Sequence, residues 1–155
     1  MHLLFVCTGN TCRSPIARAI AEAKVLERGL GGVTISSAGI SAWGGASASD
    51  GALLVGLEHA IDLAPHRASV LTRELVASSD LILTMGQQHL ESVEMLGGAG
   101  KSWLLTDYAS LGATHAPITD PFGGDLEVYR ATWAELDRLV GRALDRALAE
   151  RGPAR

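Results

Sequence analysis

Short apolar segments alternate along this chain with longer segments of helical pattern. The first apolar segment, 3–6, contains an aromatic and a β-branched residue and runs into a turn-forming segment at 8–10, which is typical of a strand buried on both faces. A helix is expected over 14–27, because serine favours the helix N-cap, proline suits the first turn and a glycine follows. Further strands are expected at 33–36, 80–85 and 102–105, and further helices at 49–60, 72–78, 87–96 and 125–149.

This alternation predicts a parallel sheet that is covered by helices on both faces. The last helix has the clearest pattern, because its apolar residues recur three and four positions apart and so share one face. They are Leu126, Tyr129, Trp133, Leu136, Val140, Ala143 and Ala147. No repeat or linker interrupts the pattern. We therefore expect residues 1–155 to form one domain, a three-layer Rossmann-like α/β sandwich with a four-stranded parallel sheet.

The composition argues against several classes of protein. The chain has 13 basic and 17 acidic residues and a formal net charge of −4, whereas nucleic-acid binders are usually basic. With 47% hydrophobic residues it can fill a core, and no run of about 20 apolar residues could span a membrane. Two cysteines are too few for a disulfide scaffold, and the N-terminus lacks a signal-peptide pattern. We expect a cytoplasmic protein with free thiols and with neither nucleic acid nor membrane as partner.

The segment between the first strand and the first helix carries the chemistry. Cys7 and Arg13 stand at the two ends of a glycine-containing turn that opens a helix. Ligands of doubly wound sheets bind beyond the carboxyl ends of the strands, and a helix N-terminus there favours an anion. The amides of 8–13 can surround a phosphate, and the guanidinium of Arg13 can hold two of its oxygens. We expect this field to lower the pKa of Cys7 below about 8.5 and to make it a nucleophile toward phosphorus.

The surroundings of the Cys–Arg pair make this motif specific. A cysteine with an arginine six positions later arises easily by chance. The preceding buried strand, the glycine in the loop and the following Ser-Pro reduce that chance strongly. A structural metal site is not expected, because two cysteines without a nearby histidine cannot supply four ligands. We expect neither a metal nor a cofactor.

The sequence Val-Cys-Thr-Gly-Asn-Thr-Cys-Arg-Ser-Pro at 6–15 resembles the signature loop of the low-molecular-weight protein tyrosine phosphatase family. The resemblance extends along the whole chain. It includes Ser37-Ala38-Gly39, Ile61-Asp62-Leu63, His66-Arg67, the expected strand at 80–85 and Asp120-Pro121-Phe122.

The resemblance implies hydrolysis of phosphorylated protein side chains through a phosphocysteine, with inorganic phosphate as product. Cys7 would be the nucleophile, and Asp120 would act first as acid and then as base. By itself an Asp-Pro pair is more often a turn or a cap, so the role of Asp120 comes from the resemblance alone. The remaining loop residues would bind the phosphate together with Arg13. They are Thr8, Gly9, Asn10, Thr11, Cys12 and Ser14.

The resemblance also implies a supporting role for Ser37 and His66, as hydrogen-bond partners that hold Asn10 in a strained turn. Two alternatives stay open elsewhere. Cys12 is either a packed thiol or the partner of Cys7 in a reversible disulfide under oxidation. Trp43 lies either at the rim of the pocket or in the core.

Two positions depart from typical tyrosine-directed members. Thr11 stands where those carry a bulky aliphatic residue, and Phe122 is followed by glycine in place of a second aromatic residue. Both departures resemble the bacterial protein arginine phosphatases. A hydroxyl tolerates the charged guanidinium beside phosphorus better than a methyl group does, and Phe122 can stack on it. We expect Thr11 and Phe122 to determine specificity, with phosphoarginine as the substrate and phosphotyrosine as the alternative.

Two further classes fit less well. An arsenate reductase of this fold needs relay cysteines, and the chain has none beyond Cys12. A catalytically silent phosphopeptide-binding module would be expected to lose Cys7 or Asp120, and both are present. For the oligomeric state we expect a monomer.

Overall fold

The computed structural model describes residues 1–152 and contains a four-stranded sheet of parallel strands in the order β2-β1-β3-β4. The strands are β1 (His2–Cys7), β2 (Thr34–Gly39), β3 (Leu81–Thr84) and β4 (Ser102–Leu104). The residues of β1 from Leu3 to Val6 are fully buried, as expected for a central strand. The predicted four-stranded parallel sheet is confirmed.

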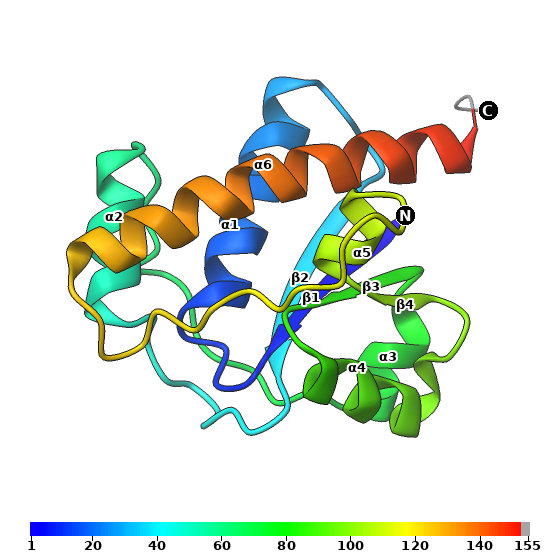
Figure 1. Ribbon diagram of the computed structural model, residues 1–155, viewed down its shortest axis with the longest axis horizontal. Helices are drawn as coiled ribbons and strands as arrows, with labels where there is room; N and C mark the ends of the chain where they lie inside the picture. The colour runs from blue at the N-terminus through cyan, green and yellow to red at the C-terminus, as the bar shows by residue number, and fades with distance from the viewer. Residues whose placement is uncertain (153–155) are drawn as a thin grey trace.

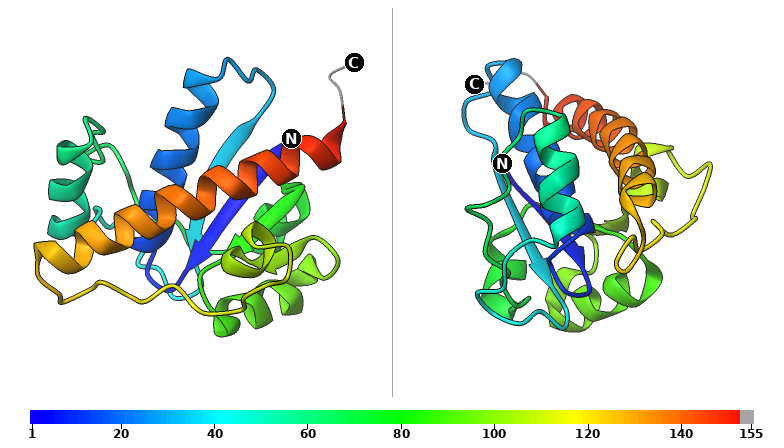
Figure 2. Two further views of the ribbon diagram at one scale, coloured as in Figure 1. Left: turned by 45° about the horizontal axis from the view of Figure 1, so that its top comes forward. Right: turned by 90° about the vertical axis from the view of Figure 1, so that its left-hand side faces the viewer.

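Helices cover both faces of this sheet (Figure 1). They are α1 (Arg13–Glu27), α2 (Asp50–Glu58), α3 (Arg73–Ser78), α4 (Gln87–Val93), α5 (Leu105–Ala109) and α6 (Leu126–Arg151), and a π-helical turn, η1 (Glu94–Gly98), continues α4. Figure 2 shows α1 and α6 together on one side of the sheet. None of the helices within 1–152 is long and apolar enough to cross a membrane.

Alternate residues of β1 pack into two separate hydrophobic clusters. Leu3 and Phe5 lie in the larger cluster, which contains the buried faces of α1 and α6. Leu4 and Val6 lie in the smaller cluster with residues of α3 and α4. Because successive side chains of a strand point to opposite faces, this division confirms the three-layer sandwich.

The two longest helices follow the sequence pattern with one correction. The predicted stripe of α6 is buried from Tyr129 to Ala147, and the Asp125 carboxylate accepts a hydrogen bond from the amide of Val128 at 3.1 Å. In α1, however, Ser14 is not the N-cap, because the helix already begins at Arg13. The Ser14 side chain is instead buried against Cys7, where it serves the site described below.

The region after the third strand departs most from the sequence prediction. The sequence predicts neither a helix nor a strand between 105 and 125, but the chain forms the short helix α5 directly after β4. Five residues are too few to show a helical period, so only their packing against α6 and β3 identifies them. The expected helix at 87–96 becomes α4 followed by η1, which ends at Gly98 and in which Gly97 has a non-helical φ of 97°.

Gly39, the last residue of β2, lies directly beneath the loop that follows β1. It is the partner of Cys7 in the β1–β2 pairing. A Cβ atom at this position would lie 2.5 Å from the carbonyl oxygen of Thr8 and 2.9 Å from the amide nitrogen of Asn10. Both are backbone atoms, so the loop can approach β2 this closely only because residue 39 is glycine.

We predict that Gly39→Ala destabilises the protein by about 1–3 kcal/mol, because the added methyl group overlaps the backbone of the loop. Gly44→Ala is the matched control, since a Cβ there meets no atom of residues 1–152 within 4 Å. We expect this control to change stability by less than about 0.5 kcal/mol. Urea unfolding of the two variants measures both effects, and equal midpoints would contradict the close approach.

Candidate active site

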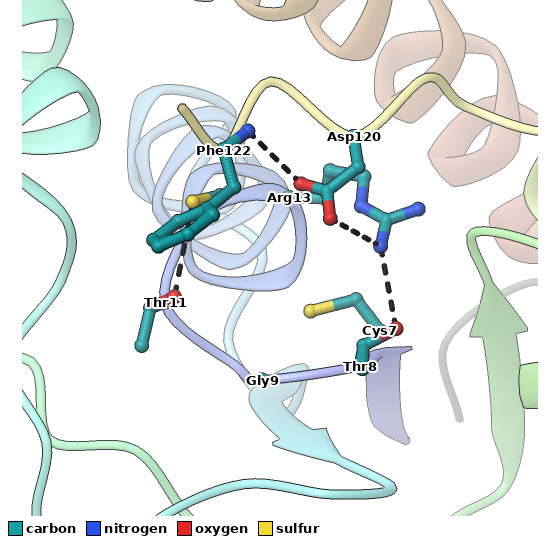
Figure 3. Close-up of a pocket in the computed structure, with 8 residues that line it drawn as sticks. Cys7, Thr8, Gly9, Thr11, Arg13, Asp120 and Phe122 are labelled. Atoms are coloured by element: carbon teal, nitrogen blue, oxygen red, sulfur yellow. Dashed lines mark hydrogen bonds and ion pairs between the residues drawn. The ribbon is translucent and has the colours of Figure 1, made fainter. Parts of the chain in front are cut away.

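The loop between β1 and α1 surrounds a cavity of about 270 Å³ at the carboxyl end of β1 (Figure 3). Residues from this loop and from the segment before α6 line it. They are Cys7, Thr8, Gly9, Thr11, Cys12, Arg13, Asp120 and Phe122. The three expected catalytic residues therefore lie at one cavity, although Asp120 is more than 100 positions from the other two. Asn10 and Ser14 are fully buried and support the loop from behind.

Cys7 is buried, and its thiol contacts the Ser14 hydroxyl. The distance between Cys7 Sγ and Ser14 Oγ is 2.8 Å, and Ser14 Oγ also accepts a hydrogen bond from Asn10 Nδ2 at 2.7 Å. When Cys7 is a thiolate it has no proton to give, so Ser14 is then the donor of this bond while its oxygen still accepts from Asn10.

Burial and hydrogen bonding have opposite effects on the thiol of Cys7. Burial raises the pKa of Cys7, whereas hydrogen bonds from Ser14 and the charge of Arg13 lower it, and burial is the larger effect. The loop field that the sequence predicts does lower the pKa of Cys7, but burial outweighs it, so the net direction is upward instead of the expected downward one. The charged and polar neighbours could be read from the sequence, but the extent of desolvation could not.

Asn10 holds the loop in its shape. Its backbone has a φ of 56°, in the left-handed region that asparagine tolerates better than most residues. Its side-chain nitrogen Nδ2 donates to Ser37 Oγ at 3.0 Å, and its side-chain oxygen Oδ1 accepts from the backbone amide of Ser69 at 2.9 Å. His66 Nε2 lies 2.7 Å from the Asn10 carbonyl oxygen and must donate to it, since a carbonyl only accepts. Both expected partners are in place, and Ser69 joins them.

Arg13 is buried with its guanidinium at the cavity. Its Nη1 donates to the carbonyl of Ile118 at 3.0 Å, and its Nη2 lies 3.5 Å from both the Asp120 carboxylate and Thr8 Oγ1. Its Nε is buried and has no hydrogen-bond partner among residues 1–152. A buried N–H group without a partner is costly, and an anion in the cavity can satisfy it.

Asp120 lies across the cavity from the loop, with its side chain 51% exposed. One carboxylate oxygen accepts a hydrogen bond from the amide of Phe122 at 3.1 Å, and the other faces Arg13. Figure 3 shows Thr11 and Phe122 on the opposite side of the pocket from Asp120 and Arg13. The Phe122 ring is 72% exposed and so forms an outer wall.

The structure describes both residues for which the sequence leaves alternatives. Cys12 is a packed, buried thiol that donates to Ser49 Oγ at 3.1 Å and lies 3.4 Å from the Tyr129 hydroxyl. Its disulfide with Cys7 stays a prediction for oxidising conditions. Trp43 is 85% exposed, which excludes the core alternative.

One residue beside the cavity, His89 in the first turn of α4, was not predicted from the sequence. Its Nε2 lies 2.8 Å from Thr8 Oγ1, and the side chain is fully buried. Burial, together with the charge of Arg13, lowers the pKa of His89 to about 4. The available signal was its position just after the third strand, since the carboxyl ends of parallel strands share one edge of the sheet.

Comparisons with known proteins agree with this geometry. Residues 2–152 match the family model described as low molecular weight phosphotyrosine protein phosphatase. A protein-arginine-phosphatase of Geobacillus stearothermophilus is 39% identical over 149 residues, which cover 96% of this chain and 97% of that protein. The low molecular weight protein-tyrosine-phosphatase PtpB of Staphylococcus haemolyticus is 38% identical over 143 residues, covering 92% and 96%.

A solved structure points to the same chemistry. It is a YwlE arginine phosphatase mutant with a phosphorylated active-site serine, 37% identical to this chain, and it superposes with a TM-score of 0.88 over 97% of both chains. A phosphoryl group on the active-site residue supports a phosphoenzyme mechanism based on cysteine. This chain is therefore a phosphatase that belongs to the low molecular weight phosphotyrosine protein phosphatase family.

Proposed function

We propose that this chain is a protein arginine phosphatase that hydrolyses phosphoarginine through a phosphocysteine formed on Cys7. The observation that carries the choice of substrate is the position of Thr11, whose side chain lines the cavity next to Phe122. A hydroxyl at this wall can face the polar nitrogen side of phosphoarginine, where an aliphatic group would leave it without a partner. Relatives named protein-arginine-phosphatase at 39% and 37% identity support the same choice.

In the first step the phosphoryl group lies in the loop, against the amides of 8–13 and the free donors of Arg13. The thiolate of Cys7 attacks phosphorus opposite the leaving nitrogen, so that an S–P bond forms as the P–N bond breaks. Asp120 gives its proton to the departing guanidine nitrogen. Arg13 and the loop amides stabilise the charge on the phosphoryl oxygens during transfer.

In the second step water hydrolyses the phosphocysteine. Asp120, now a carboxylate, takes a proton from the water, whose oxygen attacks phosphorus. A P–O bond forms, the S–P bond breaks, and Cys7 leaves as a thiolate that the Ser14 hydroxyl stabilises. The product is inorganic phosphate, and no step uses a metal or a cofactor.

The second candidate is a phosphotyrosine phosphatase with the same mechanism. It is favoured by the exposed ring of Phe122, which can stack on the phenol of phosphotyrosine. The relative PtpB, named a tyrosine phosphatase, is 38% identical. In this alternative the Thr11 side chain only packs in the wall of the cavity and does not select the substrate.

We further propose that residues 1–155 act as one catalytic domain, in a cytoplasmic monomer whose partners are phosphorylated proteins. All described site residues lie on one sheet and its connections. Two unpaired thiols, one of them the nucleophile, suit a reducing compartment.

Phosphate release from a phosphoarginine protein and from a phosphotyrosine peptide, compared as kcat/KM, tests the proposal. Cys7→Ser serves as the blank. We expect phosphoarginine to be preferred by about tenfold or more. A preference for phosphotyrosine would favour the second candidate, and turnover that survives Cys7→Ser would overturn both.

We predict that Thr11→Ile shifts the ratio of kcat/KM values toward phosphotyrosine by about tenfold, because the aliphatic side chain leaves the polar leaving group without a partner. Thr11→Ser is the matched control, since it keeps the hydroxyl and removes only a methyl group. The control should retain the preference of the wild type. An unchanged ratio in Thr11→Ile would show that Thr11 does not select the substrate.

Asp120→Asn is expected to lower kcat by about 10²- to 10⁴-fold, since the amide can neither give nor take the proton. Asp125→Asn makes the same change five positions later in the chain, at the N-cap of α6. Asparagine caps a helix about as well as aspartate, so this variant should retain near-normal kcat. Steady-state kinetics distinguish the two, and equal kcat values would remove Asp120 from the mechanism.

Ser14→Ala is expected to raise the pKa of Cys7 further, because it removes the hydrogen bond that favours the thiolate. The pH profile of Cys7 alkylation by iodoacetamide should move to higher pH, and kcat/KM should fall by about tenfold. Ser69→Ala is the control, since only its backbone amide contacts Asn10. An alkylation profile unchanged by Ser14→Ala would contradict the role of this hydroxyl.

A further inference from the structure

His89 is a fully buried histidine that the mechanism above does not use. The carboxyl end of β3 brings it to the site, since the amide of Met85 donates to the carbonyl of Val6 at 3.1 Å and α4 begins just beyond. Its ring reaches the loop at one point, where Nε2 lies 2.8 Å from Thr8 Oγ1. Its Nδ1 is buried and has no hydrogen-bond partner within 1–152.

These contacts determine which ring nitrogen carries the proton. Burial of the ring, and after it the nearby charge of Arg13, disfavour a positive charge on His89, so the ring is neutral and has a single N–H group. If Nδ1 carried the proton, a buried N–H donor would have no partner, which is rarer in proteins than an unused acceptor. The proton is therefore on Nε2, and His89 donates it to the Thr8 hydroxyl.

The direction of this bond determines what Thr8 can do. Its oxygen then accepts from His89 at 2.8 Å and faces Arg13 Nη2 at 3.5 Å, so both acceptor sites are directed toward donors. The hydroxyl proton has no acceptor among the hydrogen bonds of the described chain. Thr8 lines the cavity, so this proton can be donated to an anion bound there.

We propose that His89 is a positioning residue, which orients the Thr8 hydroxyl as an additional hydrogen-bond donor to the transferring phosphoryl group. The inference rests on the proposed phosphatase mechanism and adds a side-chain donor to the amides and to Arg13. The residue after β3 also supports Arg13. The carbonyl of Ile118 accepts a hydrogen bond from Arg13, and the amide of Ile118 donates to the carbonyl of Met85 at 2.8 Å. The end of β3 thus supports both Thr8 and Arg13.

Three variants test this role: His89→Leu, His89→Gln and Thr8→Val. His89→Leu removes the donor, and we expect it to raise the inhibition constant of inorganic phosphate about tenfold and to lower kcat by a similar factor. His89→Gln places an amide N–H group near the position of Nε2, so both constants should return to within about threefold of the wild type. In a Thr8→Val background, His89→Leu should add no further loss, because the hydroxyl that it orients is already gone.

A structural role alone would give a different pattern. The leucine and glutamine variants would then lose activity equally, and the losses from Thr8→Val and His89→Leu would add; either result overturns the inference. If His89→Leu does not fold, nitrogen NMR of the wild-type imidazole tests the inference through the tautomer of His89. We expect the proton on Nε2, and a proton on Nδ1 would overturn the inference. A wild type that hydrolyses neither phosphoarginine nor an aryl phosphate would instead overturn the proposed function, and phosphate binding and the tautomer would still be measurable.

Discussion

The site depends on the hydrogen bonds that hold Asn10 in a left-handed conformation. This backbone shape turns the loop around the cavity, and it is stabilised from β2 by Ser37, from the next connection by Ser69 and His66, and from α1 by Ser14. Four separate contacts offset a strained φ that would cost about 1–3 kcal/mol. The Asn10 side chain also donates a hydrogen bond to the Ser14 hydroxyl, which in turn contacts the Cys7 sulfur. The residue that shapes the loop therefore also positions the partner of Cys7.

The charges and donors of the site favour an anion. Burial raises the pKa of Cys7, the Nε donor of Arg13 has no partner within 1–152, and Asp120 faces Arg13 at 3.5 Å. In the proposed mechanism a phosphoryl group would accept hydrogen bonds from Arg13 and compete with Asp120 for its guanidinium. In the proposed mechanism these donors, which folding has already placed, would stabilise the transferred group, at the cost of burying them.

Much of this arrangement could be predicted from the sequence, because it is local. The strand before Cys7, the glycine-containing turn after it and the apolar stripe of α6 each follow from neighbouring residues. His89 could not be found in this way, because its role depends on the pairing of β3 beside β1. The helix α5 was too short to show a period, and the pKa of Cys7 depends on burial by distant residues. These three features could not be predicted because each depends on contacts between segments that are distant in the sequence.

The central claim is that Cys7 carries the phosphoryl group, and trapping the intermediate tests it most directly. Wild-type protein is mixed with excess phosphoarginine substrate, quenched with acid within milliseconds and digested for mass spectrometry. We predict that the peptide containing Cys7 gains the mass of one phosphoryl group, that Asp120→Asn changes how much accumulates, and that Cys7→Ala shows none. Phosphate release without any labelled Cys7 peptide, or label on another residue, would contradict the mechanism.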